Sequence, residues 1–171
     1  MTIQLDTLSN GLRVVTEHMP GLKSASVGIY VLAGGRHERP EQNGIAHFLE
    51  HLMFKGTDTL APGQLSKEID KRGGTDNAYT SQDVTVYHQE IAKEHLDLIM
   101  GMEADRMVNS KVAKADLETE FSVVRNEMES GENSPIRIMF QRTLATMFEW
   151  HNYGKTTIGN RSDIERVPID N

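Results

Sequence analysis

The sequence predicts an α+β fold, in which a mixed or antiparallel sheet has helices packed on one side. Short runs that alternate apolar and polar residues predict strands; in Ser24–Leu32, for example, Val27 and Ile29 fall on one face. Longer runs with apolar residues three and four apart predict amphipathic helices. The two kinds of run are grouped along the chain rather than strictly alternating, which favours α+β over a parallel α/β arrangement.

Turn-forming residues set the boundaries of the elements. Ser9-Asn10-Gly11 predicts a hairpin turn, because Asn-Gly adopts positive φ readily. Pro62 suits the first turn of a helix, which Gly73-Gly74 ends. The predicted strands are Ile3–Thr7, Leu12–Glu17, Ser24–Leu32, Thr75–Ser81 and Val84–Ile91, of which the last two form a hairpin. The predicted helices are Gly44–Phe54, Gln64–Lys71, Lys93–Met107, Lys114–Ser130 and Pro135–Trp150.

Composition excludes several classes of function. The 171 residues suffice for about one domain. A net charge of -7, with no basic patch that contains aromatic residues, argues against a nucleic-acid partner. There is no cysteine, so neither a disulfide framework nor thiol chemistry is available. No run approaches the roughly 20 apolar residues of a membrane span, and the N-terminus does not resemble a signal peptide, so we expect a cytoplasmic protein without a membrane partner.

The strongest indication of chemistry is the pattern H-x-x-E-H at residues 47–51. Residues four apart lie on one face of a helix, so His47 and His51 can bind one metal ion. The carboxylate of Glu50 lies beside that ion, where a general base is needed. This order of residues is the inverzincin signature of zinc peptidases. The alternative is an ordinary core helix that contains two histidines by chance.

The same helix has a second, apolar stripe. Spacings of four, seven and eight residues predict that this stripe is buried, and its members are Ile45, Leu49, Leu52 and Met53.

A catalytic zinc site needs three protein ligands and one open position, so a third ligand is required. Glu127 is the best candidate, because it lies in a clearly amphipathic helix. Glu120 precedes it by two turns, so both carboxylates lie near the border between the core and the solvent. For Glu120 a solvated surface acid is the alternative. The apolar residues that define this helix are Leu117, Phe121, Val124 and Met128.

Motifs along essentially the whole chain resemble the pitrilysin/insulinase family of zinc metalloendopeptidases, which includes the mitochondrial processing peptidases and many bacterial homologues. They are an opening hairpin, the zinc helix with the glycines before it, a substrate-side strand, an acidic pair and a later segment. The matching residues are Asn10–Val14, Gly34–Arg36 with Glu38, Gly44–Thr57, Gly74, Asn77–Thr80 with Thr85 and Tyr87, Glu120 with Glu127, and Tyr153-Gly154 with Gly159. The resemblance implies a LuxS/metallopeptidase-like half-domain.

The resemblance also implies roles for the site residues. His47, His51 and Glu127 would ligate one Zn²⁺ ion per chain. Glu50 would be the general base. Glu120 would be a second acid that supports the catalytic site without ligating the metal, for example by orienting a ligating imidazole.

The resemblance places a bound peptide substrate along one strand. Asn77, Ala78 and Thr80 match the stretch that contacts the peptide. If this stretch is an exposed edge, a substrate could add to the sheet as a further strand. An ordinary inner strand is the alternative.

Two classes of function remain. The first is a zinc metalloendopeptidase that hydrolyses peptide bonds through a zinc-activated water. The second is a non-catalytic scaffold or partner subunit of the same fold. A structural zinc module fits poorly, because such sites usually have four ligands rich in cysteine.

The length of the chain predicts an incomplete enzyme. Family members usually have two related halves, each longer than this chain. We therefore expect residues 1–171 to form an N-terminal zinc-binding peptidase domain, truncated at its C-terminus and weak or inactive alone. Its partner would be the missing C-terminal half or a separate subunit.

Overall fold

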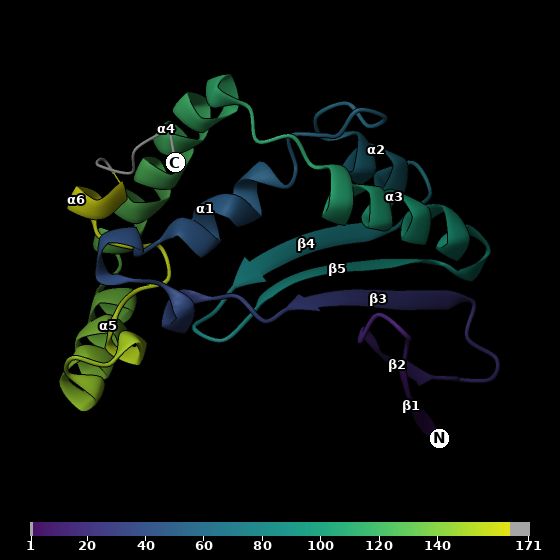
Figure 1. Cartoon of the computed structure of the whole chain (residues 1–171), viewed down its shortest axis with the longest axis horizontal. Helices are drawn as coiled ribbons and strands as arrows, with labels where there is room; N and C mark the ends of the chain where they lie inside the picture. Colours follow the sequence, from purple (N-terminus) through teal and green to yellow (C-terminus); the bar gives the residue numbers. More distant parts are fainter. Residues whose placement is uncertain (1, 165–171) are drawn as a thin grey trace.

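The computed structural model of the chain describes residues 2–164. Its centre is a three-stranded antiparallel sheet with the strand order β3-β5-β4. Helices α1, α2 and α3 lie on the side of β4, and α4 and α5 stand at one end of the sheet (Figure 1). The strands are β3 (Ser24–Val31), β4 (Thr75–Thr80) and β5 (Thr85–Ala92), and the helices are α1 (Ile45–Leu52), α2 (Gln64–Asp70), α3 (Leu96–Asn109), α4 (Lys114–Glu132) and α5 (Pro135–Phe148).

The predicted α+β class is confirmed, and most boundaries agree with the prediction within about two residues. One predicted helix begins differently: the 3₁₀ turn η3 (Lys93–His95) precedes α3, which continues to Asn109. The short helices η1 (Gly35–His37), η2 (Pro40–Gln42), η4 (Asn152–Gly154) and α6 (Arg161–Ile164) were not predicted. Within residues 2–164, no helix combines the length and the apolar character needed to cross a bilayer.

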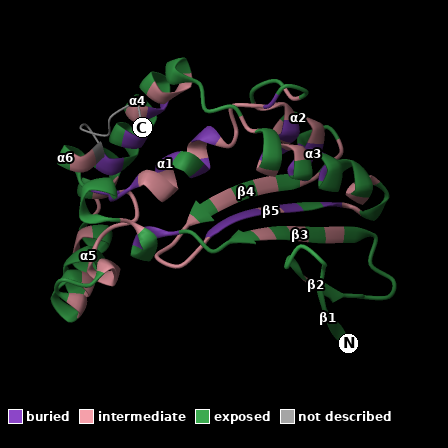
Figure 2. Cartoon of the chain, viewed as in Figure 1, coloured by how far each residue is buried: buried purple, intermediate pink, exposed green. Residues whose placement is uncertain are grey.

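The N-terminal hairpin forms a sheet of its own. Strands β1 (Ile3–Thr7) and β2 (Arg13–Glu17) pair antiparallel, with Thr7 opposite Arg13. The turn lies at the predicted residues Ser9-Asn10-Gly11, where the N–H of Leu8 donates to the Leu12 carbonyl at 2.8 Å, but within it only Gly11 has a positive φ. The Asn10 side chain instead accepts a hydrogen bond from the backbone N–H of Leu12 at 3.1 Å. The hairpin lies below β3 and is almost fully exposed (Figures 1 and 2).

Two apolar clusters hold the helices in place. One joins α2 and α3 to the inner strand β5, whose buried residues are visible in Figure 2. The other packs α1 against α4 through Phe48, Leu52, Val124 and Met128. Within it, the rings of Phe48 and Phe121 stack with their centroids 4.6 Å apart. Burying each such side chain contributes about 1.5–3 kcal/mol, so this contact fixes the position of α1 relative to α4.

The apolar stripe predicted for α1 is partly wrong. Leu52 is buried, but Leu49 is 44% exposed. The buried position beside it is Phe48, which the periodicity did not select. Phe48 faces α4, whereas Leu49 is rotated about 100° further around the helix, away from that contact.

Candidate metal centre

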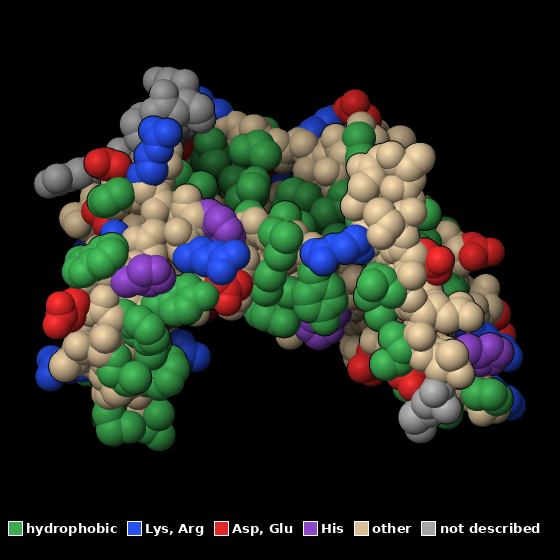
Figure 3. Space-filling view, turned by 60° about the horizontal axis from the view of Figure 1, so that its bottom comes forward, with side chains coloured by type: hydrophobic (Ala, Val, Ile, Leu, Met, Phe, Trp, Pro, Cys, Tyr) green, Lys and Arg blue, Asp and Glu red, His purple; other side chains and the backbone are tan. Residues whose placement is uncertain are grey.

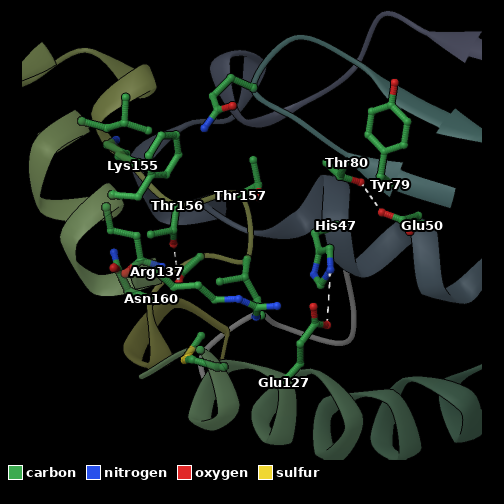
Figure 4. A pocket seen from close by; sticks show the side chains of 18 of the residues that line it. His47, Glu50, Tyr79, Thr80, Glu127, Arg137, Lys155, Thr156, Thr157 and Asn160 are labelled. Carbon is green, nitrogen blue, oxygen red and sulfur yellow. Dashed lines mark hydrogen bonds and ion pairs between the residues drawn. The ribbon is translucent and has the colours of Figure 1, made fainter. Parts of the chain in front are cut away.

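Three potential metal ligands converge where α1 meets α4. Oε2 of Glu127 lies 3.5 Å from Nε2 of His47 and 3.7 Å from Nε2 of His51. One donor atom from each residue lies within 4.8 Å of the other two. Figure 4 shows His47 and Glu127 facing each other from their two helices. The structure therefore brings together the three residues that the sequence predicted as ligands.

The chemistry of these donors fits Zn²⁺. Burial lowers the pKa of His47, and the neighbouring His51 lowers it further, although the Glu127 carboxylate opposes both effects. A lower pKa favours the neutral imidazole, which is the form that binds metal. Two imidazole nitrogens and one carboxylate oxygen form a typical catalytic zinc set, with a coordination position left for water.

Glu120 lies behind His51. Its Oε2 atom is 3.0 Å from Nδ1 of His51, and its Oε1 atom forms an ion pair with Lys55. Glu120 is only 4% exposed, so the solvated alternative is wrong. Burial acts to raise the pKa of Glu120, but hydrogen bonds from Lys55 and His51 outweigh it and hold the pKa below its usual value. A carboxylate only accepts hydrogen bonds, so Nδ1 of His51 donates, which leaves Nε2 free for a metal.

Glu50 is buried beside the three ligands. Burial raises the pKa of its carboxyl group, while a hydrogen bond from Thr80 and the nearby His51 oppose the rise. The Thr80 hydroxyl donates to Oε2 of Glu50 at 2.5 Å (Figure 4). A carboxylate with a raised pKa accepts a proton more readily, as a general base must.

The four residues open into a cavity of about 540 Å³. Strand β4, the C-terminal part of α4, helix α5 and the segment 154–161 form its other walls. Strand β4 is at the edge of the sheet within the described residues, so the inner-strand alternative is wrong. Of the residues predicted to contact substrate, Ala78 and Thr80 line the cavity. Asn77 does not line it and is exposed.

Backbone contacts fix the start of α1. The Glu38 carboxylate accepts hydrogen bonds from the backbone N–H groups of Gly44 at 2.8 Å and Ala46 at 2.7 Å. Gly44 has a φ of +101°, and a Cβ atom there would meet the Ile158 carbonyl oxygen at 2.7 Å. On the other side of this contact, a Cβ on Gly159 would meet the carbonyl oxygen of Asn43 at 2.4 Å. The close approach of two glycines thus joins the segment 154–161 to the zinc helix.

Several residues near the site were not assigned a role from the sequence. Lys55 was noted only as part of the zinc-helix motif, although it contacts Glu120 directly. Tyr79 lines the cavity beside the two predicted strand residues. Arg137 and Lys155 also line the cavity (Figure 4). The spacing of apolar residues in the sequence does not indicate that α5 packs beside this cavity.

Comparison with known proteins identifies the family of this chain. The family profile described as insulinase (peptidase family M16) matches residues 13–161. A zinc protease from Mycobacterium leprae is 39% identical over 161 residues, which cover 94% of this chain and 36% of that protein. A probable mitochondrial-processing peptidase subunit beta from Arabidopsis thaliana is 36% identical over 164 residues, which cover 96% of this chain and 31% of that protein. The chain thus spans about a third of the length of these relatives.

Solved structures share the fold. A protease from Helicobacter pylori superposes with a TM-score of 0.93 and 32% identity, covering 99% of this chain and 41% of that one. The periplasmic protease PqqL from Escherichia coli superposes with a TM-score of 0.85 at 23% identity, covering 98% of this chain and 19% of that one. At this level of identity the similarity supports the fold alone. Because the family profile covers most of the sequence, this chain belongs to the insulinase family of peptidases, family M16.

Proposed function

We propose that this chain carries the zinc site and the general base of a metalloendopeptidase. The observation that carries the proposal is the convergence of His47, His51 and Glu127 on one point, with the buried Glu50 beside it. Relatives named as zinc proteases support the choice of metal. A bound zinc ion would supply Lewis-acid chemistry, polarising the peptide carbonyl and acidifying a water molecule.

The residues of the chain perform the proton transfers. Glu50 accepts a proton from the attacking water and then donates it to the leaving amine. Thr80 holds the Glu50 carboxylate through the hydrogen bond that it donates. Glu120 holds the ring of His51 through Nδ1, which keeps the metal-binding nitrogen directed toward Glu127.

The peptide substrate binds along β4 in this proposal. Its free edge offers backbone N–H and C=O groups to an extended peptide, and main-chain hydrogen bonds of this kind require little sequence selectivity. Ala78 and Thr80 would lie along the peptide, because they line the cavity that contains Glu50. Asn77 was expected to share this role, but in this geometry it could only contact a peptide from the outer face of the strand.

Metal analysis of the purified protein tests the zinc site. We expect about one zinc ion per chain, and a sharp loss of zinc in Glu127→Gln. The matched control is Glu118→Gln on the same helix, which is exposed and should leave the zinc content unchanged. Equal zinc in the wild type and in Glu127→Gln would remove Glu127 from the site.

The Glu50→Gln variant tests the base. We expect it to retain zinc and lose peptide hydrolysis, because the amide cannot accept the proton from water. Hydrolysis near the wild-type rate would exclude Glu50 as the base. A wild-type protein that binds zinc and shows no hydrolysis with any partner would favour the non-catalytic subunit of the same fold.

We further propose that the chain hydrolyses peptides weakly alone and needs additional polypeptide, either a C-terminal half or a separate subunit. It spans only about a third of its relatives. Large apolar side chains remain exposed, including Ile3, Tyr30 and Trp150. Figure 3 shows several groups of hydrophobic side chains exposed on one face of the molecule. Turnover by residues 1–171 equal to that of a longer polypeptide containing them would contradict this proposal.

A further inference from the structure

We propose that Lys55 is a positioning residue of the zinc site, which fixes Glu120 so that Glu120 orients His51 toward the metal. The inference rests on the proposed zinc site and extends it by one residue that is outside the set of three ligands and does not line the cavity. It predicts that Lys55 controls zinc affinity, and that it does so only through Glu120.

A continuous line of contacts leads from Lys55 to the metal position. The Lys55 ammonium forms an ion pair with Oε1 of Glu120. The other carboxylate oxygen, Oε2, accepts a hydrogen bond from Nδ1 of His51 at 3.0 Å. The opposite ring nitrogen, Nε2, faces Glu127 at 3.7 Å. Each group in this line therefore limits the rotation of the next one.

The Glu120 carboxylate depends on Lys55 for its orientation. Its partners within residues 2–164 are Lys55 and His51, one for each oxygen. The side chain is nearly fully buried, so water offers little replacement for a lost partner. Without Lys55, Glu120 would keep only the contact to His51 and could turn about its terminal torsion, which is soft for a carboxylate.

The backbone places Lys55 for this role. Lys55 lies three residues beyond Leu52, the last residue of α1, and its N–H donates to the Leu52 carbonyl at 3.0 Å. The next residue, Gly56, has a φ of +97°, and a Cβ there would meet the Leu60 carbonyl oxygen at 2.5 Å. The turn at Gly56 therefore tolerates only glycine, and it fixes the direction in which the chain leaves the zinc helix. Lys55 is itself partly exposed, so replacing it disturbs the core little.

The two histidines differ in whether a carboxylate binds the ring nitrogen that faces away from the metal position. Nδ1 of His47 is buried and has no hydrogen-bond partner among the described residues. His51 is therefore the imidazole that an outer carboxylate orients. Mutation of such outer partners typically weakens metal binding by about 10–100-fold.

Zinc affinity, measured by competition with a chromophoric chelator, tests the proposal. We expect Lys55→Met to weaken zinc binding roughly tenfold, and Lys55→Arg, which keeps the positive charge, to restore most of the affinity. The matched control is Lys71→Met, because Lys71 also pairs with a glutamate but on the exposed surface of α2. Thermal unfolding of the metal-free variants shows whether a change in folding contributes.

A double-mutant cycle separates positioning from a general structural effect. In a Glu120→Gln background, Lys55→Met should cause little further loss of zinc affinity, since its effect passes through that carboxylate. An equal loss in both backgrounds, or unchanged affinity in Lys55→Met, would overturn the role of Lys55 while leaving the zinc site intact. A wild-type protein that binds no zinc would instead overturn the proposed function together with this inference.

Discussion

The hydroxyl of Thr80, on edge strand β4, donates a 2.5 Å hydrogen bond to the carboxylate of Glu50, on helix α1. Thr80 thus joins the strand expected to bind peptide to the residue expected to act as the base. Oγ1 of Thr80 also lies 3.3 Å from Oγ1 of Thr85 on the neighbouring strand β5. The position of the base is therefore coupled to the sheet as well as to the zinc helix.

Removing the Thr80 hydroxyl should destabilise the protein. Thr80→Val leaves the buried Glu50 carboxylate without its donor, so the free energy of unfolding should fall by about 1–3 kcal/mol. Thr80→Ser keeps the hydroxyl and should stay near the wild type. Urea denaturation of both variants measures the difference. Wild-type stability in Thr80→Val, or destabilisation of Thr80→Ser by the same amount as Thr80→Val, would show that the hydrogen bond does not account for the effect.

The contacts of Glu38 predict a second effect on stability. Its carboxylate accepts hydrogen bonds from two N–H groups at the start of α1, which otherwise have no partner within the helix. Glu38→Ala should lower the free energy of unfolding by about 1–2 kcal/mol, as for loss of a helix cap. Glu41→Ala, at an exposed position nearby, is the control. Identical denaturation midpoints for the two variants would contradict a capping role for Glu38.

Much of this fold could be predicted because its helices and strands begin and end at turn-forming residues that the sequence shows directly. Pro62 and Gly73-Gly74 enclose α2, and alternating residues mark β3 to β5. Periodicity, however, does not tell which side of a helix receives a partner. The periodicity selected Leu49 for the core of α1, but α4 docks on the side of the helix that carries Phe48.

The site was predictable to the extent that its residues lie close in sequence or follow the family pattern. The H-x-x-E-H motif contains two ligands and the base, whereas Glu127 joins them only because α4 packs on α1. The contact between Lys55 and Glu120 spans the same interface, so no local pattern could predict it. Alternation along β4 places Asn77 on the strand face opposite Ala78, but it does not tell which of these residues reach the cavity, since Tyr79 lines it from the same face as Asn77.

The meeting of Gly44 with the segment 154–161 predicts a large cost for a small substitution. Gly44→Ala should destabilise the protein by more than the about 1–2 kcal/mol of a left-handed alanine, because its Cβ would also meet the Ile158 carbonyl oxygen at 2.7 Å. Gly63→Ala is the matched control, since Gly63 has a φ of +67° and nothing within 4 Å of the added atom. Urea denaturation should therefore separate the two variants. If their unfolding free energies are equal, the close approach is not rigid in solution.

The buried Tyr87 predicts a loss of stability at alkaline pH. Burial raises the pKa of its phenol to about 12, with Arg106 opposing the rise from a position 4.5 Å from the ring centroid. The unfolded phenol titrates near pH 10. Between about pH 10 and 12 the unfolded chain releases this proton while the folded chain keeps it, so stability is fully present below pH 10 and falls as the pH rises.

Tyr87→Phe should remove this contribution, because phenylalanine has no proton to release. The difference in unfolding free energy between wild type and Tyr87→Phe should therefore change by up to about 3 kcal/mol across that window, and it should stay constant below pH 9. Tyr30→Phe is the control, because Tyr30 is 67% exposed. Urea denaturation at a series of pH values measures these differences. Parallel pH profiles for wild type and Tyr87→Phe would show that the phenol ionises as readily in the folded protein as in the unfolded chain.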